Sequence, residues 1–407
     1  MADRLKRPLT VEEALARVLD GVAPIAETTM VPLLAGQGSV LAAPLLALHT
    51  QPPFDASAMD GYAVRAADIQ RLPAILQIVG EAAAGHAFQG TLAAGEAVRI
   101  FTGAPVPDGA DAIVIQENAR RDGAALTIPA GRADREHVRP RGGDFASGDQ
   151  VIPANARLTA RALTLAAAAG HAHLAIRRPP TVAILATGDE LVMPGTQPLA
   201  GQIVCSNPFG IAAMVTAAGG RATLLGIARD TRDSLDAHIA QAAGADILVT
   251  LGGASVGDHD LVGPALAARG LDLAFWNIAM RPGKPMMFGR LGAQRVLGLP
   301  GNPVSSLVCA RLFLVPLIRA LLGLPPEPPL GQPARLACAL PANGPRAHYM
   351  RANCLRDVDG SRRVKPLPNQ DSSLLTPLAA ADCLIVRAIA APALEAGAEV
   401  PVLTLDF

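Results

Sequence analysis

Between residues 181 and 322 the chain alternates apolar segments with helix-like ones, and this rhythm restricts the fold more than any other feature. Asn207 as a cap and Pro208 at the first helical position predict one helix, which ends at Gly219-Gly220, and Thr231 begins the next. Further helices are expected near residues 260 to 268 and from the 300-PGNP turn to Leu322. Apolar strands separated by helices indicate a mainly parallel sheet covered on both faces. The expected strands are 181-TVAILAT, 223-TLLGIA, 246-DILVTLGG and 295-RVLGL.

The flanking segments follow other patterns. Thr10 is suited to cap a helix that reaches Val22, and Thr159 to cap an Ala/Leu helix that reaches Gly170. Between about residues 52 and 149, short Val/Ile-rich runs alternate with Gly, Pro and Asp, which predicts a β-rich domain; the last ~80 residues predict a small barrel or sandwich. We interpret residues 177–180 and 323–333 as linkers. The fold class is therefore multidomain α/β.

The composition excludes several classes of protein. The chain has 407 residues, of which 50% are hydrophobic, and a formal net charge of zero, so a disordered chain and a basic nucleic-acid or membrane surface are not expected. The five cysteines are odd in number and include no C-x-x-C pair, which argues against disulfides and structural zinc. No apolar run reaches the ~18 residues of a membrane span, and no signal peptide is apparent, so we expect a cytoplasmic protein.

Four loops that follow the expected strands share a Gly- or Pro-rich character: 186-ATGDEL, 250-TLGGASVGDHD, 280-MRPGKP and 298-GLPGNPVSS. Ligands of open α/β sheets bind beyond the carboxyl ends of the strands. Glycine lets the backbone approach a ligand closely, and free N–H groups and hydroxyls attract anions. A phosphate or another oxyanion would suit this edge, although any single loop of this kind is also compatible with an ordinary turn. The residues concerned are Gly252, Gly253, Gly257, Ser255, Ser305 and Ser306.

Two acidic pairs accompany these loops: Asp258 with Asp260, and Asp189 with Glu190. Carboxylates near phosphate loops commonly hold Mg²⁺. The alternative for Asp260 is a helix cap. His259, between the two aspartates, is interpreted as solvent-facing or structural rather than catalytic.

Lys284 stands out because the chain contains only three lysines, the others being Lys6 and Lys365. An ammonium group with three rotatable donors suits a tetrahedral oxyanion, and Arg281 adds a second positive charge. The alternative is a surface turn that carries two cations.

Other candidates are weaker. Asp60 in 57-SAMDGYAV could be a base, a metal ligand or a turn residue, and Thr102 ends a strand in 99-RIFTGAPVP. The charged turn 139-RPRGGD has no assigned use. Near the C-terminus an arginine-and-serine set could form an oxyanion pocket or an ordinary surface: Arg346, Arg351, Ser372 and Ser373.

Seven segments together resemble the MoeA/gephyrin E-domain family, the molybdopterin molybdenumtransferases. They are 54-FDASAMDGYAV, 101-FTGAPVP, 187-TGDEL, 252-GGASVGDHD, 282-PGKP, 299-LPGNPVSS and 369-NQDSSLL. The resemblance implies a homodimer with four domains per chain. These are a discontinuous domain of residues 1–45 and 145–178, a β-rich domain of 46–144, a three-layer molybdopterin-binding α/β domain of 179–325 and a β-barrel-like domain of 326–407. It also implies a site between the α/β domain and the partner chain's β-rich domain, where Asp60 and Thr102 would act.

The implied reaction inserts molybdate into adenylylated molybdopterin with Mg²⁺ and releases AMP, which gives the molybdenum cofactor. By resemblance, Asp258, Asp260 and Glu190 would hold Mg²⁺ or position the phosphoryl link, and molybdate would meet Lys284, Arg281, Arg351 and Ser372 or Ser373. The pterin phosphate would lie against Gly252, Gly253, Ser255, Gly257, Gly301, Asn302 and Ser305. Where the family pattern has K-P-G-K-P, this chain has Arg281 first, so Lys284 is the stronger candidate.

Three alternatives remain at this stage. A molybdopterin adenylyltransferase resembles the α/β region alone, whereas this chain carries both flanking regions. A non-enzymatic pterin carrier or scaffold is a second possibility, and a tungsten-inserting relative is a third. A molybdopterin adenylyltransferase is the expected upstream partner, and molybdoenzymes or their chaperones are the expected recipients.

Overall fold

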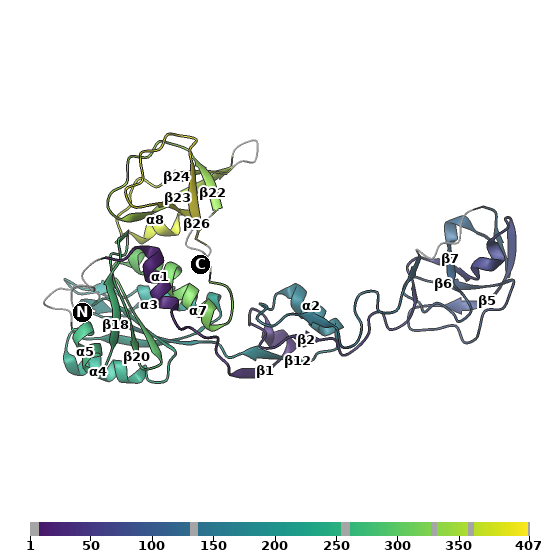
Figure 1. Cartoon of the computed structure of the whole chain (residues 1–407), viewed down its shortest axis with the longest axis horizontal. Helices are drawn as coiled ribbons and strands as arrows, with labels where there is room; N and C mark the ends of the chain where they lie inside the picture. The colour runs from purple at the N-terminus through teal and green to yellow at the C-terminus, as the bar shows by residue number, and fades with distance from the viewer. Residues whose placement is uncertain (1–7, 131–136, 254–260, 327–331, 357–361, 406–407) are drawn as a thin grey trace. The chain divides into compact units, whose positions relative to one another are not determined.

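The computed structural model describes residues 8–130, 137–253, 261–326, 332–356 and 362–405. It divides into two compact units, which are described separately (Figure 1). The first contains the chain up to Thr29 and from Arg177 onward, and the second contains Met30–Ile176.

The first unit is built on a six-stranded sheet in the order β16-β13-β17-β21-β20-β18. Neighbours among the first four strands are parallel, and β20 is antiparallel to both β21 and β18, so β18 runs in the same direction as the parallel strands. The mainly parallel sheet is therefore confirmed, and the loops after β13, β17, β18 and β21 share one edge. The strands are β13 (Thr181–Thr187), β16 (Arg221–Ala228), β17 (Ile247–Leu251), β18 (Asp272–Asn277), β20 (Pro285–Leu291) and β21 (Gln294–Leu299).

Helices cover both faces of this sheet. Ala183 and Leu185 of β13 pack with Leu235 of α4 (Arg232–Gln241) and Leu266 of α5 (Val262–Ala268) in one core. The opposite face meets α3 (Asn207–Ala218) and α6 (Pro303–Cys309), and α7 (Val315–Leu321) packs against α3. The three-layer arrangement follows because β13 is buried on both sides. The predicted cap of α4, Thr231, is confirmed, whereas α3 already includes Asn207 and has Ser206 at its N-cap position without a side-chain capping bond.

The predicted long helix is present but contains one wide turn. A π-helical segment, Ala310–Leu314, joins α6 to α7, and Pro316 follows it. Proline has no N–H and its ring clashes with the carbonyl four residues earlier, which accounts for the wider turn. Within the described residues, Pro303–Leu321 is long and apolar enough to cross a membrane, but 72% of it is buried in the protein, as in a core helix.

The N-terminal helix α1 (Val11–Leu19) belongs to this unit. Thr10 and Glu13 form a reciprocal capping box, as the predicted cap required. Leu9 N–H donates to the Asn277 carbonyl at 3.1 Å, and Arg17 Nη1 donates to the Ala274 carbonyl at 2.7 Å. The first 29 residues are therefore grouped with the α/β part rather than with residues 145–178, where the resemblance placed them. The four domain boundaries as a set remain a prediction.

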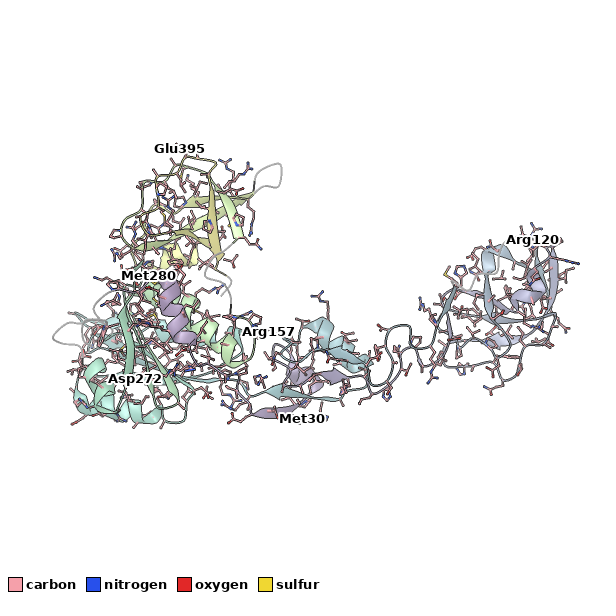
Figure 2. The ribbon with its side chains drawn as sticks, in the orientation of Figure 1. Met30, Arg120, Arg157, Asp272, Met280 and Glu395 are labelled. Atoms are coloured by element: carbon pink, nitrogen blue, oxygen red, sulfur yellow. The ribbon has the colours of Figure 1, made fainter. Side chains whose placement is uncertain are left out.

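The C-terminal region forms a closed five-stranded barrel, which decides between the predicted barrel and sandwich. Closure arises because β23 pairs with both β24 and β25. The short strand β19 (Met280–Arg281), which follows β18, adds to β23 and connects the α/β part to the barrel near Met280 (Figure 2). The barrel strands are β22 (Gln332–Leu336), β23 (Ala347–Arg356), β24 (Arg362–Pro366), β25 (Cys383–Arg387) and β26 (Glu399–Thr404).

The second unit contains the predicted β-rich region, a six-stranded sheet in the order β7-β4-β6-β5-β9-β8. Three of its strands match the predicted runs: β6 (Glu96–Ile100), β7 (Ala112–Ile115) and β9 (Ala125–Ile128). The others are β4 (Gly61–Val64), β5 (Ala74–Ala82) and β8 (Arg120–Asp122). The same unit holds α2 (Ala160–Ala168), capped by Thr159 as predicted.

The segment at residues 177–180, interpreted as a linker, is instead held in place by hydrogen bonds. Arg178 makes two hydrogen bonds to the Asp246 carboxylate, at 2.8 and 3.0 Å, and one to Glu27 at 2.6 Å. Asp246 also accepts from the N–H and hydroxyl of Thr181, at 2.7 and 2.9 Å. Burial raises the pKa of Asp246, but the bonds from Arg178 and Thr181 outweigh it and hold that pKa below its usual value.

Candidate functional site

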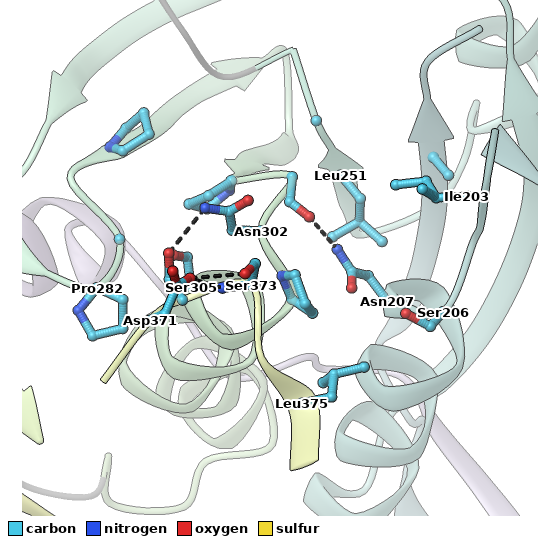
Figure 3. A pocket seen from close by; sticks show the side chains of 18 of the residues that line it. Ile203, Ser206, Asn207, Leu251, Pro282, Asn302, Ser305, Asp371, Ser373 and Leu375 are labelled. Carbon is cyan, nitrogen blue, oxygen red and sulfur yellow. Dashed lines mark hydrogen bonds between the residues drawn. The ribbon is translucent and has the colours of Figure 1, made fainter. Parts of the chain in front are cut away.

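A cavity of about 1010 Å³ lies in the first unit, at the edge where the parallel strands end (Figure 3). The loops after β13, β17, β18 and β21 line it, together with residues 370–373, with Arg346 just before β23 and with His348 on β23. The structure therefore brings together loops that the sequence predicted to meet. The predicted site residues on its lining are Glu190, Gly252, Arg281, Lys284, Gly301, Asn302, Ser305, Ser372 and Ser373.

Glycine is required where the strand ends crowd together. Gly252 has a φ of +94°, and a Cβ on it would lie 2.9 Å from the Thr187 carbonyl oxygen at the end of the neighbouring strand. A Cβ on Gly301 would lie 3.8 Å from the Gly252 Cα. The two predicted glycine loops therefore approach each other backbone to backbone, which leaves peptide groups facing the cavity.

The 300–306 turn and the 369–374 loop hold each other. Asn302 Nδ2 donates to Ser372 Oγ at 2.9 Å, and Val304 N–H donates to the Ser372 carbonyl at 3.1 Å. Asn207 Nδ2 supports the turn from α3 by donating to the Gly301 carbonyl at 2.7 Å. Figure 3 shows Asn302, Asn207 and Ser305 around the same space. Asn207 is a site residue that sequence reasoning treated only as a helix cap.

Asp371 shapes the second of these loops. Its Oδ1 accepts from the N–H and the hydroxyl of Ser373, both at 2.8 Å, and the backbone bond from Ser373 lowers its pKa most. The Ser373 hydroxyl is therefore committed to Asp371, whereas Ser372 faces Asn302.

Arg351, which the sequence analysis placed at the molybdate site, lies elsewhere in the structure. It is only 1% exposed, and it is absent from the cavity lining. Its Nη1 donates to the Leu374 carbonyl at 3.0 Å and its Nη2 to the Asp371 carbonyl at 2.9 Å. Arg351 therefore holds the 369–374 loop from inside, because its guanidinium is occupied by backbone oxygens.

Three cationic side chains reach the cavity: Arg281, Lys284 and Arg346. Arg281 Nη2 donates to Asn343 Oδ1 at 3.1 Å. Within the described part of the chain, the side chains of Lys284 and Arg346 have no hydrogen-bond or ion-pair partner. Free donors of one charge, gathered at a polar cavity, are suited to an anion.

His348 also lines the cavity, and the sequence analysis did not select it. Burial lowers its pKa most, and the nearby arginines Arg281, Arg346, Arg351 and Arg387 lower it further, to about 4. The imidazole is therefore neutral near pH 7. The signal that was missed is the charged neighbourhood: His348 lies between Arg346 and Arg351 in the sequence.

The structure describes only some of the predicted metal ligands. Glu190 is exposed and lines the cavity, whereas Asp189 faces Arg229, with 4.0 Å between Asp189 Oδ1 and Arg229 Nη1. Gly253, at a φ of +61°, lies beside the lining. Ser255, Gly257, Asp258 and Asp260 lie outside the described residues. Among the described residues, no group of three or more His, Cys, Asp or Glu side chains could hold a metal ion.

Asp60 and Thr102 meet each other in the second unit. Asp60 Oδ1 accepts from the Thr102 N–H and hydroxyl, both at 2.8 Å, and these bonds lower its pKa. Arg99 lies over the rings of Tyr62 and Phe101, at 5.1 and 4.7 Å from their centroids, and donates to the Gly61 carbonyl. The motif thus presents an ionised carboxylate on a rigid turn.

The fold and the cavity together define a multidomain α/β protein with a cation-lined cavity at the carboxyl edge of its sheet. Comparisons with known proteins name the class more closely. Residues 9–170 match the MoeA N-terminal region (domain I and II), residues 183–320 a probable molybdopterin binding domain, and residues 333–405 the MoeA C-terminal region (domain IV).

Relatives match along most of the chain. A molybdopterin molybdenumtransferase from Nostoc is 37% identical over 94% of this chain and 89% of its own, and one from Haemophilus influenzae is 33% identical over 93% and 94%. A crystal structure of a molybdopterin biosynthesis MoeA protein from Pyrococcus horikoshii covers 98% of this chain and 100% of its own, at 30% identity and a TM-score of 0.82. The chain belongs to the molybdopterin molybdenumtransferase (MoeA) family.

Proposed function

We propose that this chain inserts molybdate into adenylylated molybdopterin, releasing AMP and forming the molybdenum cofactor. One observation carries the proposal: the two uncommitted cations, Lys284 and Arg346, reach the same cavity as the glycine loops of the α/β domain. An adenylyltransferase reading fits less well, because the match extends through the flanking regions.

The cavity offers separate groups to the two reactants. The backbone at Gly252 and Gly301, with the hydroxyl of Ser305, suits the phosphate of the pterin. Lys284, Arg281 and Ser372, which also line the cavity, suit molybdate, a tetrahedral dianion. Holding both reactants in one cavity replaces a bimolecular encounter by an intramolecular one, and the cations stabilise charge on departing oxygen atoms.

The proposal includes Mg²⁺ because the donor groups at the cavity suit this ion. Mg²⁺ binds through one or two carboxylates and substrate phosphates and keeps several waters. Glu190 is exposed at the cavity and makes no hydrogen bond or ion pair with another described side chain, so it can serve as one such ligand. Asp258 and Asp260 are proposed as the others. When bound, Mg²⁺ would neutralise phosphate charge as AMP departs.

A homodimer with composite sites is the second part of the proposal. Asp60 and Thr102 belong to one unit and Lys284 to the other, and we propose that they act on one substrate across two chains. Mixing Asp60→Asn and Lys284→Ala chains tests this. If the sites are composite, half of the dimers form one intact site, which restores roughly a quarter of wild-type activity. If each chain carries its own complete site, the mixture stays inactive.

Lys284→Ala tests the site itself. We expect this variant to bind adenylylated molybdopterin normally but to lose the molybdate dependence of cofactor formation, because the oxyanion loses a free ammonium donor. The matched control is Lys365→Ala, which removes an exposed lysine from β24, outside the cavity. Cofactor formation by Lys284→Ala at wild-type rates and low molybdate would contradict the proposal.

The setting of the reaction is proposed by analogy with the family. We place the protein in the cytoplasm, downstream of a molybdopterin adenylyltransferase and upstream of molybdoenzymes or their chaperones.

A further inference from the structure

His348 occupies a position that the proposed reaction does not yet use. It lies on β23, paired in register with Arg281 on β19 and with Arg387 on β25. Residues directly opposite in neighbouring strands point to the same side of a sheet, so the three side chains form a row. His348 is 8% exposed and its remaining exposure is to the cavity.

The ring of His348 is uncommitted. Among the residues that the structure describes, none hydrogen-bonds to it, although a buried polar group normally has a partner. Arg387, its neighbour in the row, is 3% exposed, and its Nη1 likewise has no partner among the described residues. Because these two buried polar groups lack partners and lie beside a cavity lined by cations, we expect a polar, anionic ligand to bind next to them.

The charges around His348 set its response to such an anion. Arg281 faces it from β19, Arg387 from β25, Arg351 belongs to its own strand, and Arg346 lies just before that strand. The other charged groups on the cavity wall are Lys284, Glu190 and Asp371. Without an anion, burial and the arginines disfavour a protonated imidazole. A bound dianion cancels much of that field and favours the protonated form.

We propose that His348 takes up a proton from solvent when a tetrahedral oxyanion binds beside Arg281 and Arg346, and then donates a hydrogen bond to one of its oxygens. The only bond formed is N–H on the imidazole, and the proton comes from the buffer. The inference rests on the proposed function, because it assigns the ligand as free molybdate. It makes oxyanion binding tighter at lower pH, with a gain of up to about tenfold per pH unit where the bound form titrates.

Calorimetric titration of the full-length protein with sodium molybdate tests this. At pH 7, in two buffers of different ionisation enthalpy, we expect the wild type to take up more protons per bound molybdate than His348→Gln, by a fraction approaching one. The difference between the proteins removes the protonation of molybdate itself. His86→Gln, an exposed histidine in the second unit, is the matched control and should behave like the wild type.

The other outcomes are distinct. Molybdate binding with equal proton uptake in wild type and His348→Gln overturns this inference and leaves the proposed function standing. Absence of molybdate binding overturns both. A differential uptake seen with AMP but not with molybdate assigns the corner to a phosphate ester and overturns the assignment to the free oxyanion.

A measurement on the wild type keeps the test decisive if His348→Gln fails to fold. The imidazole C2–H resonance of His348 should shift toward its protonated value at pH 7 on addition of molybdate. His348→Asn, if folded, assigns that resonance among the eight histidines. A resonance that stays at its neutral position in saturating molybdate contradicts the inference.

Discussion

Replacing Gly283 by alanine is expected to damage both the stability of the first unit and its oxyanion loop. Gly283 lies between Pro282 and Lys284, with a φ of +107°. A Cβ built there would lie 2.5 Å from Cys309 Sγ and 3.3 Å from Met280 Cε. Cys309 and Met280 are completely buried, so neither can yield toward solvent.

Two costs contribute to the expected loss. A side chain in a sparsely populated backbone region costs on the order of 1–3 kcal/mol, and overpacking a dense core costs typically about 1–3 kcal/mol. We therefore expect Gly283→Ala to lower the free energy of unfolding by roughly 2–6 kcal/mol. Gly292→Ala is the matched control, because its φ of +62° also disfavours alanine but nothing lies within 4 Å of its Cβ position.

Denaturant unfolding followed by tryptophan fluorescence measures this loss, since the single tryptophan, Trp276 on β18, reports on the same unit. Adding Cys309→Ala to Gly283→Ala should recover the overpacking part, about 1–3 kcal/mol, and leave the backbone part. A Gly283→Ala variant no less stable than Gly292→Ala, or a double variant without recovery, would refute the reasoning.

Three further predictions concern groups that hold the site. Arg351→Met should raise the molybdate concentration needed for half-maximal activity while leaving pterin binding intact, because the loop that carries Ser372 loses its internal donors; steady-state kinetics check this. Asn343→Ala should likewise weaken molybdate binding, measured by calorimetry, because Arg281 loses the hydrogen bond that its guanidinium donates to Asn343. The folded-state pKa of Asp246 is depressed, so its stabilisation is present above its unfolded pKa of about 3.9 and is lost as pH falls through the folded value. The unfolding free-energy difference between wild type and Asp246→Asn should therefore shrink at acidic pH, whereas a constant difference would contradict the assigned ionisation.

The sequence predicted the elements whose signals are local. Thr10, Thr159 and Thr231 cap helices where a hydroxyl precedes a helical pattern, because the cap bond is made within three residues. The β13 strand coincides with its apolar run, because burial on both faces leaves no polar interruption.

Long-range partners were not predictable in the same way. Arg178 was assigned to a linker, yet its partners Glu27 and Asp246 lie far away in the sequence. Arg351 lies on β23 and is buried against the 369–374 loop, whereas Arg346 lies just before that strand and reaches the cavity. Nothing in the local pattern states which face of that strand meets the α/β domain.

The most direct test of the central claim is a single assay with purified protein, adenylylated molybdopterin, Mg²⁺ and molybdate, in which AMP and active cofactor are followed together. We predict AMP release that depends on molybdate and rises in step with active cofactor. Tight binding of the adenylylated pterin without AMP release, at any molybdate concentration, would contradict the claim and indicate a carrier.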